Sequence, residues 1–319
     1  MIVWIIFISG ILLFLALDLG VFNKKAHVIK AKEAAIWTSI WISVALGFSG
    51  VIWWLFSEGL TANPTELTPD DTVLKYVTGY LIELSLSIDN VFVIAVIFKA
   101  FKIPDLYQHR VLFWGILSAI VFRAHMIAFG VALINQFDWI VYVFGAFLIF
   151  TAYKMLKSDD TEFNPKKSFI FKKLRKVLPY TSFMDGEKFF IRRMGIRVAT
   201  PLFMALIIIE LTDILFALDS IPAILAITAD PFIVFSSNIL AILWLRSMYF
   251  LISRMLNKFR FINYSLVVIL TYVGLKLIFS HNIEIPEWLS LAVIGLSLVG
   301  GILASVMIPY EEPEDPSGE

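Results

Sequence analysis

The chain has no cysteine in any of its 319 positions. This absence excludes disulfide bonds, thiolate metal sites and cysteine nucleophiles.

Charged residues are also scarce. They make up 16% of the chain, whereas soluble domains hold about 25%. Hydrophobic residues make up 59%, and several segments near twenty residues long carry few or no charges. Such segments are long enough to cross a hydrocarbon core of about 30 Å as helices. We therefore predict an all-α polytopic membrane protein of about nine transmembrane helices, near residues 2–20, 33–57, 73–98, 109–134, 137–156, 198–228, 232–256, 262–280 and 287–308.

Lysine and arginine are distributed unevenly between the connections. Of the 26 basic residues, 22 lie in odd-numbered connections, and the fifth connection alone holds twelve. By the positive-inside rule the odd connections are cytoplasmic, which places the N-terminus outside and the C-terminus in the cytoplasm. No basic segment precedes the first span, so we expect an uncleaved anchor there rather than a signal peptide.

Two parts of the chain resemble each other. The segment ELSLSIDNV (83–91) matches DILFALDSI (213–221) in an acid followed six residues later by Asp. Further on, 137–156 aligns with 259–278, and Arg123 corresponds to Arg246. Each predicted repeat contains three spans, so the second copy must enter the membrane from the opposite side. Such inverted-topology repeats are typical of secondary transporters, which bind substrate near the bilayer midplane between the repeats.

The repeats divide the chain into five parts. These are two N-terminal transmembrane helices (1–72), a first three-helix repeat (73–156), a basic cytoplasmic loop (157–197), a second three-helix repeat (198–280), and a last transmembrane helix with an acidic tail (281–319). Residues 167–178 of the loop are amphipathic in places. They either lie on an anionic membrane surface or form a solvated basic loop.

Five acids fall within the spans of the two repeats: Glu83, Asp89, Glu210, Asp213 and Asp219. One central Asp costs roughly 2.5–3.5 kcal/mol, so five would cost on the order of 12–17 kcal/mol, the scale of a whole domain's stability. The intramembrane Arg123 and Arg246 cannot neutralise five carboxylates. A divalent metal ion, protonation or both would complete the site. A set of buried ion pairs that fixes helix register is the structural alternative.

The spacing of the acids also bears on the backbone. Two residues six apart lie about 240° around a regular helix and about 9 Å along it, so both cannot face one small ion. Pro222 follows Asp219, and the polar Asn90 and Ser220 each follow an Asp. We therefore predict local unwinding near Asp89 and Asp219, with backbone carbonyls freed as ligands.

Further oxygen donors are Thr212, Ser220, Asn90, Ser85 and Ser87. Oxygen ligands without thiolate suit hard cations such as Mn²⁺, Mg²⁺ and Ca²⁺. Two residues have alternative roles. His125 is a ligand, a proton carrier or a locally satisfied polar residue, and Asp18 is a gate residue or an acid at a helix end.

The segments LALDLGVF (15–22), GYLIELSLSIDNVFV (79–93), ELTDILFALDSIPAI (210–224) and DPFIVFSSNILAILWLRSMYF (230–250) resemble the TerC/Alx family of bacterial membrane proteins. The resemblance covers essentially the whole chain. It implies nine spans, a place in the LysE-type transporter group, the bacterial inner membrane as location, and export of manganese. It also implies that the five intramembrane acids handle the metal.

We therefore expect a secondary transporter, not an enzyme, that exports divalent metal ions, foremost Mn²⁺, with proton antiport as the expected coupling. Its expected partners are the metal ion as substrate and the lipid bilayer, with no resident cofactor and no nucleic acid. Ion selectivity and oligomeric state stay open. One alternative is a membrane scaffold that aids metal loading or export of other proteins. A second is an intramembrane aspartyl hydrolase with one Asp from each acidic helix, although neither Asp lies in a Gly-x-Gly-Asp motif.

Overall fold

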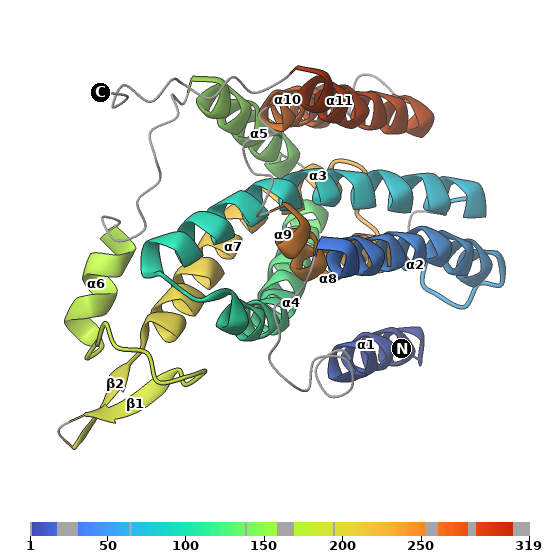
Figure 1. Cartoon of the computed structure of the whole chain (residues 1–319). Coiled ribbons are helices and arrows are strands. Elements are labelled where there is room, and N and C mark those ends of the chain that lie inside the picture. Colours follow the sequence, from blue (N-terminus) through green and yellow to red (C-terminus); the bar gives the residue numbers. More distant parts are fainter. Residues whose placement is uncertain are drawn as a thin grey trace.

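The computed structural model describes residues 2–17, 31–63, 66–137, 139–157, 169–193, 195–252, 261–279 and 285–308. Within these ranges the chain is a bundle of helices with one small hairpin at one end (Figure 1). Seven helices in these ranges are long and apolar enough to cross a membrane, and two shorter apolar helices cover Ile2–Ala16 and Asn263–Phe279. The prediction of an all-α polytopic membrane protein is confirmed.

The apolar helices coincide with the nine predicted spans to within a few residues. They are α1 (Ile2–Leu17), α2 (Ala31–Ser57), α3 (Pro69–Phe101), α4 (Asp105–Gln136), α5 (Ile140–Lys157), α7 (Pro201–Leu225), α8 (Pro231–Leu243), α9 (Leu245–Ile252), α10 (Ile262–Phe279) and α11 (Glu287–Met307). The helices α8 and α9 together form the seventh span and are separated only at Trp244.

Local sequence sets where two central helices begin. Thr68 caps α3 by accepting a hydrogen bond from the N–H of Asp71 at 3.2 Å, and Pro69 is the first helical residue. Asp230 caps α8 by accepting from the N–H groups of Phe232 and Ile233, each at 2.9 Å, and a proline again follows. Capping side chains followed by proline are the usual start of a helix.

Both acidic helices are continuous, so the predicted unwinding near Asp89 and Asp219 is wrong. The helix α3 runs unbroken through Asp89, and α7 runs unbroken through Asp219 and Pro222. Pro222 lies three residues before the end of α7. A proline cannot donate its backbone hydrogen bond. Because Pro222 lies near the end of the helix, the loss of this bond leaves the rest of the α7 hydrogen bonds in place.

The centre of the bundle is α8, in which every residue from Phe232 to Leu243 is buried. A helix that is buried on every side belongs in the core of a membrane bundle. It packs against α2, α3 and α4, while α7 packs against α3 and α4. On one flank α1 contacts α8 through Trp4 and Phe7, which stack on Phe232. On the other flank lie α5, α10 and α11 (Figure 1).

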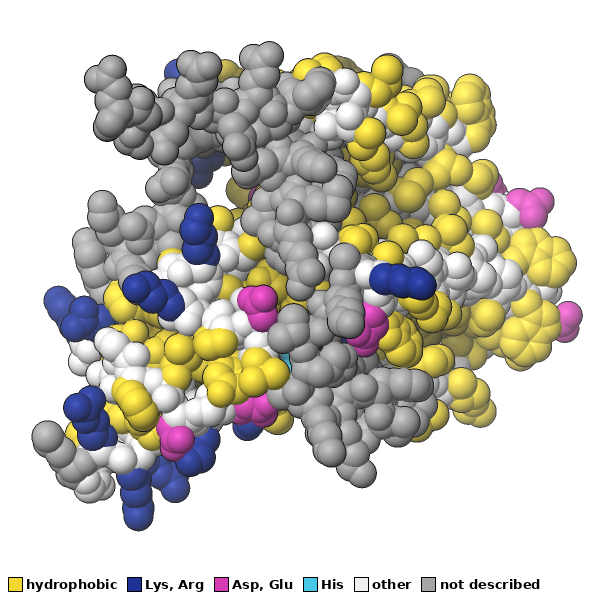
Figure 2. All heavy atoms as spheres, viewed as in Figure 1, with side chains coloured by type: hydrophobic (Ala, Val, Ile, Leu, Met, Phe, Trp, Pro, Cys, Tyr) yellow, Lys and Arg dark blue, Asp and Glu magenta, His cyan; other side chains and the backbone are white. Residues whose placement is uncertain are grey.

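Large apolar side chains are exposed on the outer helices, among them Ile5 on α1 and Leu296 on α11. Figure 2 shows this apolar surface over much of the bundle, with basic side chains gathered at the hairpin end. Exposed apolar surface of this extent is what lipid-facing helices present.

The described part of the basic loop contains structure that the sequence did not predict. It includes the short helix α6 (Phe169–Val177) and the antiparallel strands β1 (Phe190–Arg193) and β2 (Ile196–Ala199), in which Phe190 pairs with Ala199. Gly195 adopts a φ of +81° in the turn between the strands. Strands of four residues carry too little alternation to be recognised from sequence.

Candidate metal centre

Arg123 of α4 lies at the centre of a buried polar cluster with Glu83, Asp213 and Asn238, which we call the Arg123 hub. Its Nη2 donates to Oδ1 of Asp213 at 2.9 Å, and its Nε donates to Oδ2 of the same carboxylate at 3.3 Å. Its Nη1 donates to Glu83 Oε1 and, at 3.1 Å, to Asn238 Oδ1. The arginine side chain is 1% exposed and Glu83 is fully buried. One guanidinium thus joins α3, α7 and α8 to α4, as its planar array of five donors allows.

The carboxylate of Glu83 has a second partner. Asn238 of α8 donates from Nδ2 to Glu83 Oε2 at 3.0 Å, so each oxygen of this buried acid accepts a hydrogen bond. Ser220 of α7 stands at the edge of the hub, with its Oγ 3.5 Å from Arg123 Nη1. A buried charge that is both paired and hydrogen-bonded is tolerated in a low-dielectric interior.

Asp213 connects this hub to a small cavity. Its side chain is 15% exposed, and Asn90 of α3 donates from Nδ2 to its Oδ1 at 3.3 Å. The cavity has a volume of about 30 Å³. Its polar lining consists of Asn90, Glu210, Thr212 and Asp213, and the rest is apolar. Room for one water begins at roughly 10–15 Å³ on this measure, so a water or a small ion fits.

Glu210 is the unsatisfied group of this cavity. It lies on α7, one helical turn before Asp213, and its side chain is buried. Within the described part of the chain neither of its carboxylate oxygens has a partner at hydrogen-bond geometry, because the neighbouring hydroxyl of Ser118 on α4 donates to the carbonyls of Trp114 and Gly115 instead. Gly115 of α4 faces Glu210 across the helix contact and has no side chain to fill the space beside the carboxylate. A Cβ at that position would lie 3.4 Å from Glu210 Oε1. A buried carboxylate without a protein donor carries a proton, faces a cation or is hydrated by water in the cavity.

The other predicted acids lie elsewhere or are not described. Asp219 lies six residues beyond Asp213 on the continuous α7, about 240° around the helix, and its Oδ1 accepts from Thr151 of α5 at 3.0 Å. It therefore points away from the Arg123 hub, as the six-residue spacing requires. The side chain of Asp89 and the whole of Asp18 lie outside the described residues.

The supporting residues divide in a similar way. Asn90 and Thr212 line the cavity, although the hydroxyl of Thr212 donates to the carbonyl of Ile208 in its own helix at 2.6 Å. His125 is exposed on the outer face of α4, with Nδ1 2.7 Å from the carbonyl oxygen of Val121. Arg246 is buried on α9, next to Leu245 of the cavity wall.

Asn238 is the one residue of the hub that sequence reasoning did not select. It follows two serines in the segment FSSN within the otherwise apolar α8. Ser236, Ser237 and Asn238 are all fully buried. Three consecutive polar residues within a membrane span could have identified this position from sequence. Polar side chains in a membrane carry a high free-energy cost unless they have hydrogen-bond partners.

Among the described residues, no three acidic or histidine side chains lie close enough together to hold a metal ion by themselves. A metal site here would therefore need other ligands in addition to carboxylates. Glu210 and Asp213 supply charge to the cavity, and the Asn90 amide oxygen and the Thr212 hydroxyl add neutral oxygens. The Asn90 Oδ1 atom has no hydrogen-bond partner within the described ranges. These donors suit a hard divalent cation that retains some water.

Comparison with known proteins agrees with this architecture. The model of the family described as "Integral membrane protein TerC family" matches residues 68–312. A membrane protein of Myxococcus xanthus is 47% identical over 317 residues, which are 98% of this chain and 96% of the relative. A protein of Escherichia coli (strain K12) named "Putative membrane-bound redox modulator Alx" is 41% identical over 316 residues, 99% of this chain and 97% of the relative. No solved structure matches the chain.

The family model covers most of the chain and the relatives cover nearly all of it, at an identity far above chance. The chain belongs to the TerC family of integral membrane proteins.

Proposed function

We propose that the protein is a secondary transporter that exports divalent metal ions, foremost Mn²⁺, from the cytoplasm in exchange for protons. The observation that carries this proposal is the buried carboxylate of Glu210. It faces the cavity, and in the described ranges its oxygens have no protein partner at hydrogen-bond geometry. Such a group binds a cation or a proton. A site that alternates between the two would couple metal to proton movement.

The charges around the cavity favour a divalent ion. Glu83, Asp213 and Glu210 are three carboxylates, and Arg123 is the guanidinium that contacts two of them. With all four groups ionised, the cluster carries a formal charge of −2. One divalent cation neutralises this charge, whereas a monovalent ion would leave half of it buried at high cost.

Helix packing supports two inverted repeats. Under the predicted symmetry α3 corresponds to α7, α4 to α8 with α9, and α5 to α10. The helices α3 and α7 contact each other, as do α5 and α10, and the contact between α4 and α7 is matched by the contact between α3 and α8. A two-fold axis between the repeats would generate these pairs. The hub formed by Glu83, Arg123 and Asp213 lies where the repeats meet, the usual place for a transported substrate.

The position of the cavity supports access from the cytoplasm. Its walls come from the later part of α3 (90–97) and the early part of α4 (112–119). Both lie toward the α3–α4 turn, at the end of these helices that the basic residues predict to be cytoplasmic.

Manganese flux into proteoliposomes tests the proposal. We expect the intact protein to quench a metal-sensitive dye trapped inside when Mn²⁺ is added outside, and a proton gradient to change the rate. Glu210→Gln and Asp213→Asn remove the charge that the ion requires, so each should abolish quenching. Glu58→Gln, an exposed acid at the end of α2, is the matched control and should transport normally. Full transport by both cavity variants would refute the assigned site.

The name of the Escherichia coli relative indicates a redox role for that protein. In the present chain a thiol reaction is not available, because it has no cysteine. A metal transporter could alter redox balance indirectly, through the metal content of the cell. The same flux assay separates transport from the scaffold and hydrolase alternatives, since neither predicts metal movement in a purified system.

A further inference from the structure

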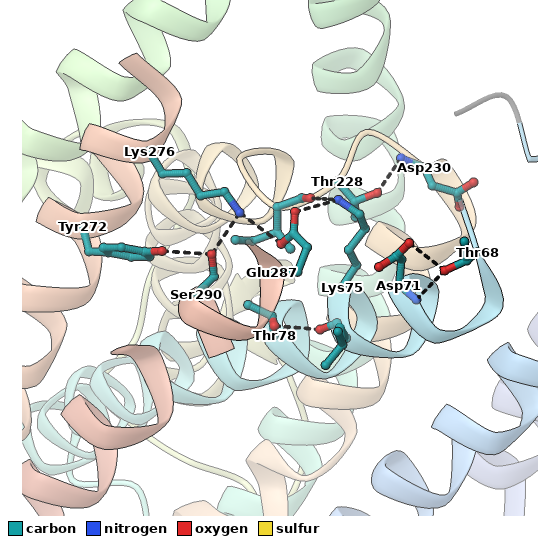
Figure 3. Close-up of polar contacts among 12 residues, drawn as sticks. Thr68, Asp71, Lys75, Thr78, Thr228, Asp230, Tyr272, Lys276, Glu287 and Ser290 are labelled. Atoms are coloured by element: carbon teal, nitrogen blue, oxygen red, sulfur yellow. Dashed lines mark hydrogen bonds and ion pairs between the residues drawn. The ribbon is translucent and has the colours of Figure 1, made fainter. Parts of the chain in front are cut away.

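A polar cluster ties together several segments at the end of the bundle opposite the hairpin (Figures 1 and 3). Glu287, the first residue of α11, lies between two lysines. Its Oε1 accepts from Lys75 of α3 at 2.9 Å, and its Oε2 accepts from Lys276 of α10 at 3.0 Å. Lys75 also donates to the carbonyl of Ile227, in the turn after α7, at 2.9 Å. Lys276 also donates to Ser290 at 2.9 Å.

This cluster links the two predicted repeats. Lys75 belongs to the first repeat, and Lys276 and Ile227 belong to the second, while Glu287 lies in the helix that follows them. In transporters of this type one repeat rocks against the other around a fixed site. Such a movement would separate these groups, because each hydrogen bond tolerates only a few tenths of an ångström of stretching.

The cluster carries a net positive charge. Two ammonium groups share one carboxylate, and the three side chains are only 14%, 9% and 20% exposed for Lys75, Lys276 and Glu287. A partly buried positive charge repels approaching cations. If the transport path passes this cluster, its charge would oppose the return of a metal ion from outside.

The packing beneath the cluster is closed. Tyr76 and Tyr80 of α3 are buried in the turns after Lys75. A Cβ added to Gly79 would lie 3.2 Å from the hydroxyl of Ser237, which is fully buried on α8. The next residue of α8, Asn238, already belongs to the Arg123 hub. The cavity at Glu210 lies on the other side of this hub, so the cavity and the cluster lie toward opposite ends of the bundle.

We propose that Lys75, Glu287 and Lys276 form the extracytoplasmic gate of the transport path. The gate is bonded in this structure, and it would separate when the site opens outward. This inference rests on the proposed transport function, and it adds three residues that the acidic motifs do not include.

The absence of cysteine makes a direct test possible. In the single-cysteine variant Ser237→Cys, the thiol lies beneath the gate and should react slowly with a membrane-impermeant maleimide added from outside. Glu287→Gln removes the central charge of the gate. It should raise the labelling rate roughly tenfold, as expected if the outward-open population grows from about 1% to about 10%. Lys75→Gln breaks the same bridge from α3 and should give a similar rise even if Glu287→Gln does not assemble.

Glu58→Gln, an exposed acid at the same end of the bundle, is the matched control and should leave the labelling rate unchanged. If the protein transports manganese but both gate variants are labelled at the unmodified rate, the gate proposal is wrong and the transport proposal stands. Increased labelling from both sides at once would indicate general loosening and would also overturn it. A protein that moves no metal would overturn the proposed function, whatever the labelling shows.

Discussion

At the scale of single residues, the site depends on a buried arginine more than on any one acid. Arg123 contacts Glu83, Asp213 and Asn238, and these contacts bring helices α3, α7 and α8 together. Removing one partner from a buried ion pair is far more damaging than replacing the whole pair, because the remaining charge is left uncompensated. The arginine therefore has a structural role that can be separated from metal binding.

Arg123→Gln should destabilise the protein by about 3–5 kcal/mol, because it leaves two buried carboxylates without their cation. Adding Glu83→Gln and Asp213→Asn to the same chain should recover much of that loss. The measurement is the midpoint of thermal or denaturant unfolding in detergent. Arg110→Gln is the matched control, since Arg110 pairs with Glu187 at 3.2 Å in a partly exposed position. This control should cost only about 0–1 kcal/mol. Equal losses for the two arginines would contradict the assigned role.

At the scale of elements, the crossing of α5 and α10 brings two helix backbones closer together than at any other described glycine. A Cβ at Gly145 would lie 2.8 Å from the carbonyl oxygen of Gly274, and a Cβ at Gly274 would lie 2.8 Å from the carbonyl oxygen of Gly145. Small residues that let two backbones approach are the usual basis of helix association in membranes. In the predicted symmetry these helices are the third members of the two repeats, so their contact would stay close to the axis during rocking.

Gly145→Ala should weaken this contact, because the added methyl group meets backbone that cannot turn aside. We expect a loss of about 1–3 kcal/mol in unfolding free energy, the usual cost of overpacking. In contrast, a Cβ at Gly47 of α2 meets nothing within 4 Å. Gly47→Ala should therefore be neutral or stabilising by up to about 1 kcal/mol, since alanine favours the helix. A variant at Gly145 that is as stable as the one at Gly47 would show that the helices do not cross this closely.

At the scale of the whole molecule, charge distribution and structure point to the same orientation. The exposed basic residues Lys188, Arg192, Arg193 and Arg197 gather on the hairpin at one end (Figure 2). The gate and the α2–α3 connection lie at the other end (Figure 1). On the positive-inside rule we propose that the hairpin lies on the cytoplasmic side.

Single cysteines in the naturally cysteine-free chain would test this orientation. Ala62→Cys, exposed between α2 and α3, should react with an impermeant maleimide added to intact spheroplasts. Ser182→Cys, exposed before the hairpin, should react only after the membrane is permeabilised. The reverse pattern would invert the topology and would place the cavity on the outer side.

Much of the fold could be predicted from sequence because a bilayer imposes a requirement on composition alone. Each span needs about 20 apolar residues, and that property is local and additive along the chain. The positions of the helices followed to within a few residues. The acidic pairs were also visible, because carboxylates within apolar runs are rare. In contrast, the unwinding predicted at Asp89 and Asp219 failed, since it assumed that both acids of a helix must serve one ion.

The sequence by itself therefore determined the membrane class, the spans and the residues that carry intramembrane charge. Only the tertiary structure decided how those charges are used. Glu83, Asp213 and Asn238 converge on Arg123 from three helices, whereas Asp219 bonds to Thr151 and Glu210 faces a cavity. Hydrogen bonds act over about 3 Å between residues far apart in sequence, so the partner of each group depends on which helix faces share an interface. Composition and spacing do not contain that information, and packing supplies it.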